Sequence, residues 1–271
     1  RQVPVVQGGF VAMYVYTCRV ISMQGGFSYQ HSVFNRATQA KRQPGSAFKP
    51  IVYAAALDSG YTPATIVIDA PIEINTPQGL WRPKNASNRF YGPTPLRTGI
   101  DQSRNLMTIR LAEEVGRQTV ASYAEQFGVY DSMGRFLANA LGSEETTLYD
   151  MVAAYAMFAN GGERVRPTLV DRIQDRYGRN VYRHDQRRCD DCARLVSLEA
   201  GFAPDIVSDR EQVMNAITAY QLTSMLKGVV DRGTAARAIN LPVPIAGKTG
   251  TTNDEKDAWF VGFSSNVVAG C

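Results

Sequence analysis

Three short motifs that each contain a serine, a lysine or both follow one another along this chain of 271 residues. They are residues 46–49 (Ser-Ala-Phe-Lys), 103–105 (Ser-Arg-Asn) and 248–251 (Lys-Thr-Gly-Thr). A serine hydroxyl is a weak nucleophile near pH 7 until a neighbouring base removes its proton. Histidine, the usual base, occurs only at His31 and His184, and there is no G-x-S-x-G segment. The motifs therefore indicate a serine nucleophile that lysine activates.

The first motif stands where a helix is expected to begin. Pro44 and Gly45 favour a turn, and the run 51–57 has the composition of a helix. At a helix N-terminus, free backbone N–H groups and the helix dipole favour negative charge on the oxygen of Ser46. Lys49, three residues further on, is expected on the same face one turn away.

Two other segments fit the same short patterns. Residues 224–227 also read S-x-x-K, and residues 264–266 also read S-x-N. The first of these lies in the middle of a periodic apolar stretch, 217–230, which a capping box over 218–221 would open. We expect it to be part of an ordinary helix, so Ser46 is the favoured nucleophile.

The motifs and their surroundings resemble the transpeptidase domain of class A (bifunctional) penicillin-binding proteins. The likeness runs over nearly the whole chain and is carried by residues 34–46, 103–106, 248–252 and 257–262. It implies a serine D,D-transpeptidase that cleaves D-Ala-D-Ala through an acyl-enzyme, cross-links peptidoglycan stem peptides and is blocked covalently by β-lactams. It implies no cofactor and no metal.

The resemblance also implies a setting for the domain. The expected location is the bacterial cell envelope, at the periplasmic face of the inner membrane. The parent protein is expected to carry a membrane anchor and a glycosyltransferase domain, both absent from this chain.

The resemblance assigns catalytic roles to Ser46, Lys49, Ser103 and Lys248. Ser46 would attack the penultimate D-Ala carbonyl, and a neutral Lys49 would take its proton. A free lysine has a pKa near 10.4, so burial and the second cation, Lys248, would have to lower it. Ser103 would relay the proton to the leaving D-Ala.

Four further assignments concern the substrate. Asn105 would hold the substrate amide, and the hydroxyls of Thr249 and Thr251, with Lys248, would bind the terminal carboxylate. Gly250 would allow the substrate to pair as an added strand. The backbone N–H groups of Ser46 and Thr251 would form the oxyanion hole.

Other functions within and outside the same chemistry stay open. A class A β-lactamase needs a glutamate in an E-x-x-L-N segment, and residues 145–149 come near but have Tyr149 where asparagine belongs. A D,D-carboxypeptidase would use the same motifs. A non-catalytic penicillin-sensing or scaffold domain is the alternative of another class.

The order of elements predicts an α+β fold of the β-lactamase/transpeptidase type. A mainly antiparallel sheet would form from both ends of the chain, flanked by helices, with an all-helical lobe inserted. The chain is expected to be one domain, with a sheet lobe at about 1–45 and 163–271, a helical lobe at about 46–162, and the motifs in the cleft between.

The predicted strands are 9–16, 19–24, 168–176, 181–183, 243–251, 258–264 and a run from 266 that stops at the chain end. The predicted helices, besides the one after Ser46, are 106–115, 148–159 and 218–230. By resemblance, the rest of the last strand and a covering helix are truncated.

Composition and cysteines limit the remaining possibilities. The chain is 44% hydrophobic with a net charge of +4 from dispersed basic residues, which does not favour nucleic-acid binding. No apolar run approaches the roughly 20 residues that span a bilayer. Cys189 and Cys192 form a C-x-x-C pair that we expect to be a disulfide, with free thiols as the alternative. The family usually turns its first hairpin on Asp-Pro-x-Thr-Gly, so Cys18 in this turn is expected to be strained or the turn rebuilt.

Overall fold

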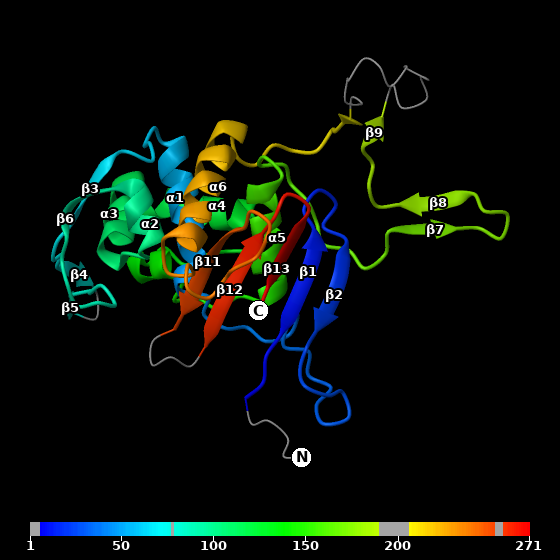
Figure 1. The fold of residues 1–271 in the computed structure, drawn as a ribbon, viewed down its shortest axis with the longest axis horizontal. Coiled ribbons are helices and arrows are strands. Elements are labelled where there is room, and N and C mark those ends of the chain that lie inside the picture. Colours follow the sequence, from blue (N-terminus) through cyan, green and yellow to red (C-terminus); the bar gives the residue numbers. More distant parts are fainter. Residues whose placement is uncertain (1–5, 77–78, 190–205, 253–256) are drawn as a thin grey trace.

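The computed structural model describes residues 6–76, 79–189, 206–252 and 257–271. Its centre is a five-stranded antiparallel sheet in the order β11-β12-β13-β1-β2 (Figure 1). The strands are β1 (Phe10–Tyr14), β2 (Val20–Gln24), β11 (Ala246–Thr251), β12 (Ala258–Phe263) and β13 (Val267–Gly270). Two come from the N-terminal end of the chain and three from the C-terminal end. The predicted α+β fold, with a sheet assembled from distant segments, is confirmed.

The helices of the described residues form one continuous apolar core with this sheet. They are α1 (Lys49–Asp58), α2 (Leu96–Asp101), α3 (Asn105–Val115), α4 (Arg117–Gln126), α5 (Leu148–Ala159) and α6 (Ala216–Asp231), with 3₁₀ turns η1 (Gly45–Phe48) and η2 (Leu137–Leu141). Helix α1 is buried over nearly its whole length, which marks it as the central helix. No helix in the described part of the chain is long and apolar enough to cross a membrane.

Helix α5 lies against the sheet and shows how sequence determines this contact. Its N-cap is Thr147, whose hydroxyl accepts a hydrogen bond from the Asp150 N–H at 3.1 Å. The helix then runs against β1, β12 and β13. A Cβ at Gly270 would lie 2.6 Å from Val152 of α5, so only glycine fits this strand position. The predicted helix 148–159 is confirmed.

The start of α6 differs from the prediction. Asn215 is the N-cap, since its side chain accepts from the Ile217 N–H at 2.8 Å. Thr218 lies inside the helix, and its hydroxyl donates to the carboxylate of Asp58 at the end of α1. The predicted capping box at 218–221 is therefore wrong, because the earlier asparagine already satisfies the free N–H groups.

The segment from 46 to 162 is not all-helical as predicted. It also contains β3 (Ile66–Asp69), β4 (Ile74–Thr76), β5 (Gly79–Trp81) and β6 (Gly92–Pro95), which pair as β3-β6 and β4-β5. Strand β6 has the sequence Gly-Pro-Thr-Pro, which looks like a turn because proline offers no N–H to a sheet. In the described part of the chain it pairs with β3 alone, and such an edge position tolerates proline. The prediction of an all-helical segment is therefore wrong at this strand.

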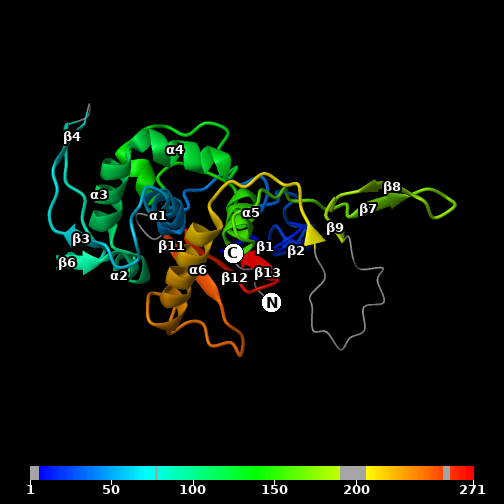
Figure 2. The same ribbon diagram turned by 90° about the horizontal axis from the view of Figure 1, so that it is seen from above.

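A peripheral hairpin extends away from the sheet, as both views show (Figures 1 and 2). It consists of β7 (Arg172–Gln174) and β8 (Asn180–Arg183), and the turn contains the predicted Gly178 at φ +80°. Next to it, β9 (Arg188–Cys189) pairs with β10 (Ile206–Val207). Cys189 is disulfide-bonded, and Cys192 lies outside the described residues.

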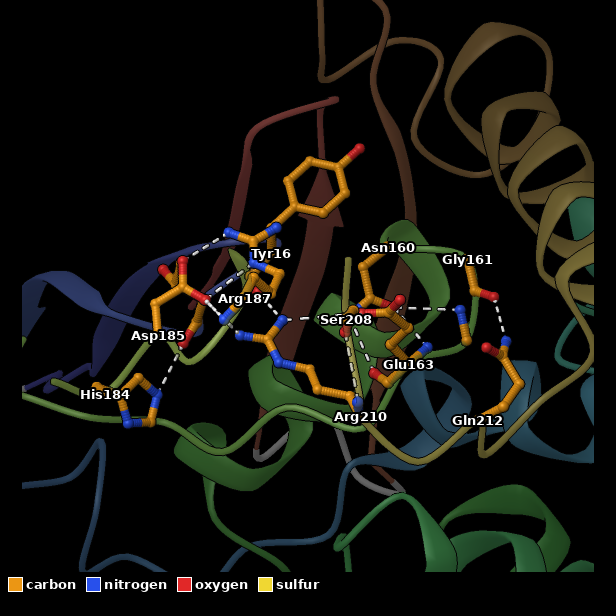
Figure 3. Close-up of polar contacts among 12 residues, drawn as sticks. Tyr16, Asn160, Gly161, Glu163, His184, Asp185, Arg187, Ser208, Arg210 and Gln212 are labelled. Carbon is orange, nitrogen blue, oxygen red and sulfur yellow. Dashed lines mark hydrogen bonds and ion pairs between the residues drawn. The ribbon is translucent and has the colours of Figure 1, made fainter. Parts of the chain in front are cut away.

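Four charged residues, here called the arginine cluster, tie this periphery to the body (Figure 3). Arg210 lies 3.2 Å from Asp185 and 3.8 Å from Glu163, and Arg187 lies 2.8 Å from Asp185. Arg210 also donates to the carbonyl of Tyr16 in the turn between β1 and β2. These ion pairs connect the hairpin with the end of α5, and the hydrogen bond to Tyr16 connects both with the first turn of the sheet.

The turn between β1 and β2 keeps an unusual backbone at Cys18. This residue has φ +51° although it is not glycine, and its side chain is fully buried. Its N–H donates to Tyr14 O at 2.8 Å, and its carbonyl accepts from Thr168 N at 3.0 Å. The left-handed conformation confirms the expected strain, which hydrogen bonds on both sides hold in place.

Candidate active site

The S-x-x-K motif lies on a 3₁₀ turn that leads directly into α1. Ser46 is half-buried in η1, and Lys49 is the first residue of α1. The Lys49 N–H donates to the Ser46 carbonyl. Residues three apart in a 3₁₀ turn are eclipsed, so the two side chains share one side of the chain.

The turn that carries Ser46 packs directly on β11, the strand of the K-T-G motif. A Cβ at Gly45, which has φ +53°, would lie 2.4 Å from Thr251 O. A Cβ at Gly250 would lie 2.4 Å from Pro44 O. Both positions need glycine because the two backbones approach so closely. Ser46 and Thr251 are therefore neighbours although about 200 residues separate them in sequence.

The amine of Lys49 is fully buried and has three acceptors. Its Nζ donates to Ser103 O at 2.7 Å, to Asn105 Oδ1 at 2.7 Å and to Ser103 Oγ at 3.1 Å. All three acceptors are uncharged. The second motif thus surrounds the lysine of the first.

Lys248 of β11 is also fully buried and reaches the same hydroxyl. Its Nζ donates to Ser103 Oγ at 3.0 Å, to Thr249 O at 3.0 Å and to Thr249 Oγ1 at 3.4 Å. Ser103 Oγ therefore lies between two lysine amines. The structure brings Lys49, Ser103, Asn105 and Lys248 into one hydrogen-bonded group, here called the lysine cluster.

Burial lowers the pKa of both lysines because a charged amine loses its hydration. For Lys49 burial is the main cause and the charge of Lys248 adds to it, so its pKa lies well below the ordinary value. Burial alone brings the pKa of Lys248 to about 7. Two cations side by side with neutral acceptors favour loss of a proton from one of the two amines.

Ser103 has the backbone that allows it to meet both amines. It lies between α2 and α3 with φ +55°, a left-handed conformation that few residues other than glycine adopt. Its N–H donates to Ile100 O at 3.1 Å, and the next N–H, of Arg104, donates to Gly99 O at 2.8 Å. This tight turn points the carbonyl and the hydroxyl of Ser103 at the same nitrogen. Such strain often marks a functional position.

Strand β11 lies at one edge of the five-stranded sheet in the described part of the chain. Thr252 N donates to Asp257 O at 3.2 Å, so hydrogen-bonded pairs with β12 fall at every second residue from there. The backbone groups of Thr249 and Thr251 then face the open edge. An extended peptide has donors and acceptors available at this edge.

Thr234 is a neighbour of the site that the sequence motifs do not indicate. Its hydroxyl lies 2.7 Å from the Thr249 hydroxyl, and its N–H donates to Asp101 O at 3.1 Å. Asp101 also pairs with Arg232 at 2.8 Å. This loop after α6 therefore touches both the K-T-G strand and the helix before Ser103. No spacing rule links Thr234 to the motifs, so only the folded structure could find it.

A large cavity lies away from the motifs. It has a volume of about 520 Å³ between the β4–β5 hairpin and η2, and its described lining does not include the motif residues. Among the described residues, no group of three or more His, Cys, Asp or Glu side chains could hold a metal ion. The chemistry available at the motifs is that of hydroxyl, amine, amide and backbone groups.

The comparison with protein families shows the family to which the chain belongs. The family model of the penicillin binding protein transpeptidase domain matches residues 8–268. The chain belongs to the penicillin-binding protein transpeptidase family. The resemblance seen in the motifs is thereby confirmed, and the match covers both the sheet and the helices.

This transpeptidase domain is similar to penicillin-binding protein 1A of Rickettsia bellii, with 44% identity over all of this chain and 34% of that protein. Among solved structures, penicillin-binding protein 1A from Haemophilus influenzae matches with a TM-score of 0.84 and 32% identity, over 99% of this chain and 43% of that one. PonA1 from Mycobacterium tuberculosis, solved in complex with penicillin V, matches with a TM-score of 0.77 over 97% and 68% of the two chains. Its 22% identity shows the fold alone. The chain spans about a third of the length of the curated relatives it matches.

Proposed function

We propose that this domain is a serine D,D-transpeptidase that cross-links peptidoglycan stem peptides through an acyl-enzyme on Ser46. The observation that carries the proposal is the lysine cluster, in which two buried amines share Ser103 Oγ beside the S-x-x-K turn. A pair of buried cations without a carboxylate partner is unfavourable for folding. Its presence is explained if one amine must be neutral in order to act as a base.

Acylation begins with proton transfer from Ser46 to Lys49. A neutral amine has two N–H bonds and one lone pair, and the two shortest contacts of Lys49 go to Ser103 O and Asn105 Oδ1. The lone pair is then left for the Ser46 proton. The Ser46 oxygen attacks the carbonyl carbon of the penultimate D-Ala, and the carbonyl oxygen becomes an oxyanion. The N–H groups of Ser46 and Thr251 stabilise it, each worth about 2.7–4 kcal/mol.

Collapse of this intermediate breaks the bond to the terminal D-Ala. The leaving nitrogen takes a proton from Ser103 Oγ, and Ser103 is reprotonated from the amines at 3.0 and 3.1 Å. The acyl group remains on Ser46 as an ester. The amine of an acceptor stem peptide then attacks this ester and loses a proton, while Ser46 Oγ recovers one. The peptide cross-link forms and the serine is regenerated.

Substrate binding uses the open edge of β11. The donor peptide pairs with this edge as an added strand, close to the backbone of Gly250. Its terminal carboxylate binds the hydroxyls of Thr249 and Thr251 near protonated Lys248, and its amide is held by Asn105. The register of β11 with β12, which leaves the backbone groups of Thr249 and Thr251 on the side away from β12, supports this arrangement.

The alternative fate of the acyl-enzyme, rapid hydrolysis as in a β-lactamase, needs a carboxylate base, and Glu144 and Glu145 are the acids of the segment that comes near the β-lactamase pattern. Glu144 Oε2 accepts from Gly134 N at 3.0 Å and from Asn139 Nδ2 at 2.6 Å, so it holds the η2 region together. Glu145 is exposed. PonA1, a structure of the same fold, was solved in complex with penicillin V. We infer that β-lactams also bind this domain, as covalent inhibitors that acylate Ser46.

The setting of the domain is part of the proposal. We infer a parent protein with a glycosyltransferase domain and a membrane anchor, held at the periplasmic face of the inner membrane. Similarity to penicillin-binding proteins 1A, of which the chain spans about a third, supports it. We also infer that residues of about 1–45 and 163–271 form one lobe and about 46–162 the other, with the motifs at their junction.

Labelling with a fluorescent penicillin tests the nucleophile. The unmodified chain is expected to form one stable adduct, and Ser46→Ala is expected to form none. Ser224→Ala is the matched control, because Ser224 begins the second S-x-x-K segment and is exposed on α6. Equal labelling of Ser46→Ala would refute the assignment. A donor stem-peptide assay then separates a transpeptidase, which yields cross-linked product, from a sensor, which yields none.

A further inference from the structure

Asn85 is a buried side chain outside the three motifs that uses its whole hydrogen-bonding capacity. It is 4% exposed and lies in the loop between β5 and β6. Its Oδ1 accepts from the N–H groups of Asn105 at 2.9 Å and Leu106 at 3.2 Å. Its Nδ2 donates to Asp69 Oδ1 at 2.7 Å and to Arg89 O at 3.0 Å.

These contacts cap α3 from a distance of 20 residues in sequence. The first N–H groups of a helix have no partner inside it, and the N-cap of α3, Arg104, provides no side-chain hydrogen bond. Asn85 takes over this task. Because Asn105 is the first residue of α3, the cap fixes the backbone of the residue that contacts Lys49.

The residue before Asn85 fixes the side chain of Asn105 as well. Lys84 O accepts from Asn105 Nδ2 at 2.8 Å, so the amide is turned with its Oδ1 toward Lys49 Nζ. One short segment of loop therefore sets both the position and the orientation of the S-x-N asparagine.

The other end of this arrangement is anchored in the core. Asp69 of β3 is fully buried, and its second carboxylate oxygen lies 4.0 Å from Arg104 Nε. Arg104 stacks on the ring of Tyr91 at 3.2 Å from the centroid. Arg104, which lies between Ser103 and Asn105, and Asn85, which caps α3, are thus both tied to Asp69 of the β3–β6 pair.

We propose that Asn85 is a positioning residue for acylation, which holds the first turn of α3 so that Asn105 Oδ1 keeps Lys49 Nζ in reach of Ser46 and Ser103. This inference rests on the proposed function. Asn85 acts through Asn105 and does not touch the substrate. Loss of the cap is expected to loosen the contact between Asn105 and Lys49, which slows acylation and changes the ionisation of the amine.

The test compares Asn85→Ala with Asn160→Ala in the full chain. Asn160 makes the same kind of contact far from the motifs, next to the arginine cluster (Figure 3). Its Oδ1 accepts from Gly162 N at 3.1 Å and Glu163 N at 2.9 Å, and its Nδ2 donates to Glu163 O at 2.9 Å. Each variant removes an asparagine that accepts from two backbone N–H groups, so a purely structural loss affects both.

The measurements are the acylation rate at saturating chromogenic β-lactam, the half-saturation concentration and the pH profile, with the melting temperature as a check on folding. Asn85→Ala is expected to lower the saturating rate at least tenfold, with a smaller change in half-saturation, and to shift the acid limb of the profile. Asn160→Ala is expected to lower the melting temperature only. An unchanged rate and profile in Asn85→Ala, or the same loss in Asn160→Ala, would overturn the inference.

A milder variant keeps the test decisive if Asn85→Ala does not fold. Asp69→Asn leaves Asn85 in place but replaces its charged acceptor with a neutral one, so an intermediate loss of rate is expected. If Asp69→Asn had the same saturating acylation rate and pH profile as the unsubstituted chain, this result would overturn the inference. If the unmodified chain itself were not acylated on Ser46, the proposed function would fail instead, and the two failures are distinguishable.

Discussion

Two groups of buried or half-buried cations in this molecule follow opposite rules. In the arginine cluster, Arg210 is 16% exposed and faces the carboxylates of Asp185 and Glu163. In the lysine cluster, Lys49 and Lys248 are fully buried and face each other across Ser103, with neutral acceptors only. One group matches charges and the other sets like charges side by side.

The difference shows that the arginine cluster stabilises the fold, whereas the charged form of the lysine cluster is unfavourable for folding. Hydrogen bonds from Arg187 hold the pKa of Asp185 below its usual value, which favours the charged form. In the lysine cluster, burial lowers the pKa of both amines and favours the uncharged form. A cluster that disfavours its own charge contributes little to stability and is expected to contribute to chemistry.

Replacing the base in the lysine cluster should give the largest effect. Lys49→Met removes the proton acceptor for Ser46, and general bases contribute about 10²–10⁴ in rate, so β-lactam acylation is expected to fall about a thousandfold. Stability should not fall, because a buried amine is replaced by an apolar side chain of similar size. Stopped-flow acylation and thermal unfolding measure the two quantities.

The matched control is Lys227→Met, which alters the lysine of the second S-x-x-K segment. Lys227 is exposed and pairs with Asp231 on the surface of α6. The Lys227→Met variant should be acylated at the same rate as the unsubstituted chain. A Lys49→Met variant that also kept its rate would remove the lysine from the mechanism.

Breaking the arginine cluster should lower the stability of the fold and leave the acylation rate unchanged. Arg210→Met leaves Asp185 and Glu163 with fewer cations and the Tyr16 carbonyl without its donor. A loss of about 1–3 kcal/mol in the free energy of unfolding is expected, with the acylation rate unchanged. Chemical denaturation measures the first and penicillin labelling the second. Slower acylation in a folded Arg210→Met variant would show that the two clusters are coupled.

The pH dependence of stability tests the lowered pKa of the lysine cluster itself. The pKa of Lys248 is about 7 in the folded chain and 10.5 as the ordinary value, so between these values the unfolded state binds more protons. The free energy of unfolding should therefore rise with pH over this range. Below about pH 7 both the folded and the unfolded state bind the proton, so Lys248 adds no pH dependence there. Lys248→Met should show a shallower rise in denaturation experiments. Identical slopes in the two proteins would contradict the lowered pKa.

The sequence predicts the elements of this fold better than their junctions. Helix 148–159 and its Thr147 cap follow from local residues, and so does the hairpin around Gly178. The left-handed backbone of Ser103 and the contact of Asn85 with α3 depend on parts of the chain that meet only after folding, so no local pattern reveals them. The pairing of β3 with β6 is not predicted, because the prolines of β6 are typical of a turn. The motif residues themselves were identifiable because their types and order are specific.

The protonation state of Lys49 is the most direct test of the account. Lysine side chains labelled with ¹³C and ¹⁵N can be titrated by NMR in the full chain, with Lys49→Met used to assign the signal. We predict that Lys49 is uncharged at neutral pH and that its pKa lies well below the ordinary lysine value of 10.5. A Lys49 amine that titrates near 10.5 would contradict the proposed role of the lysine cluster.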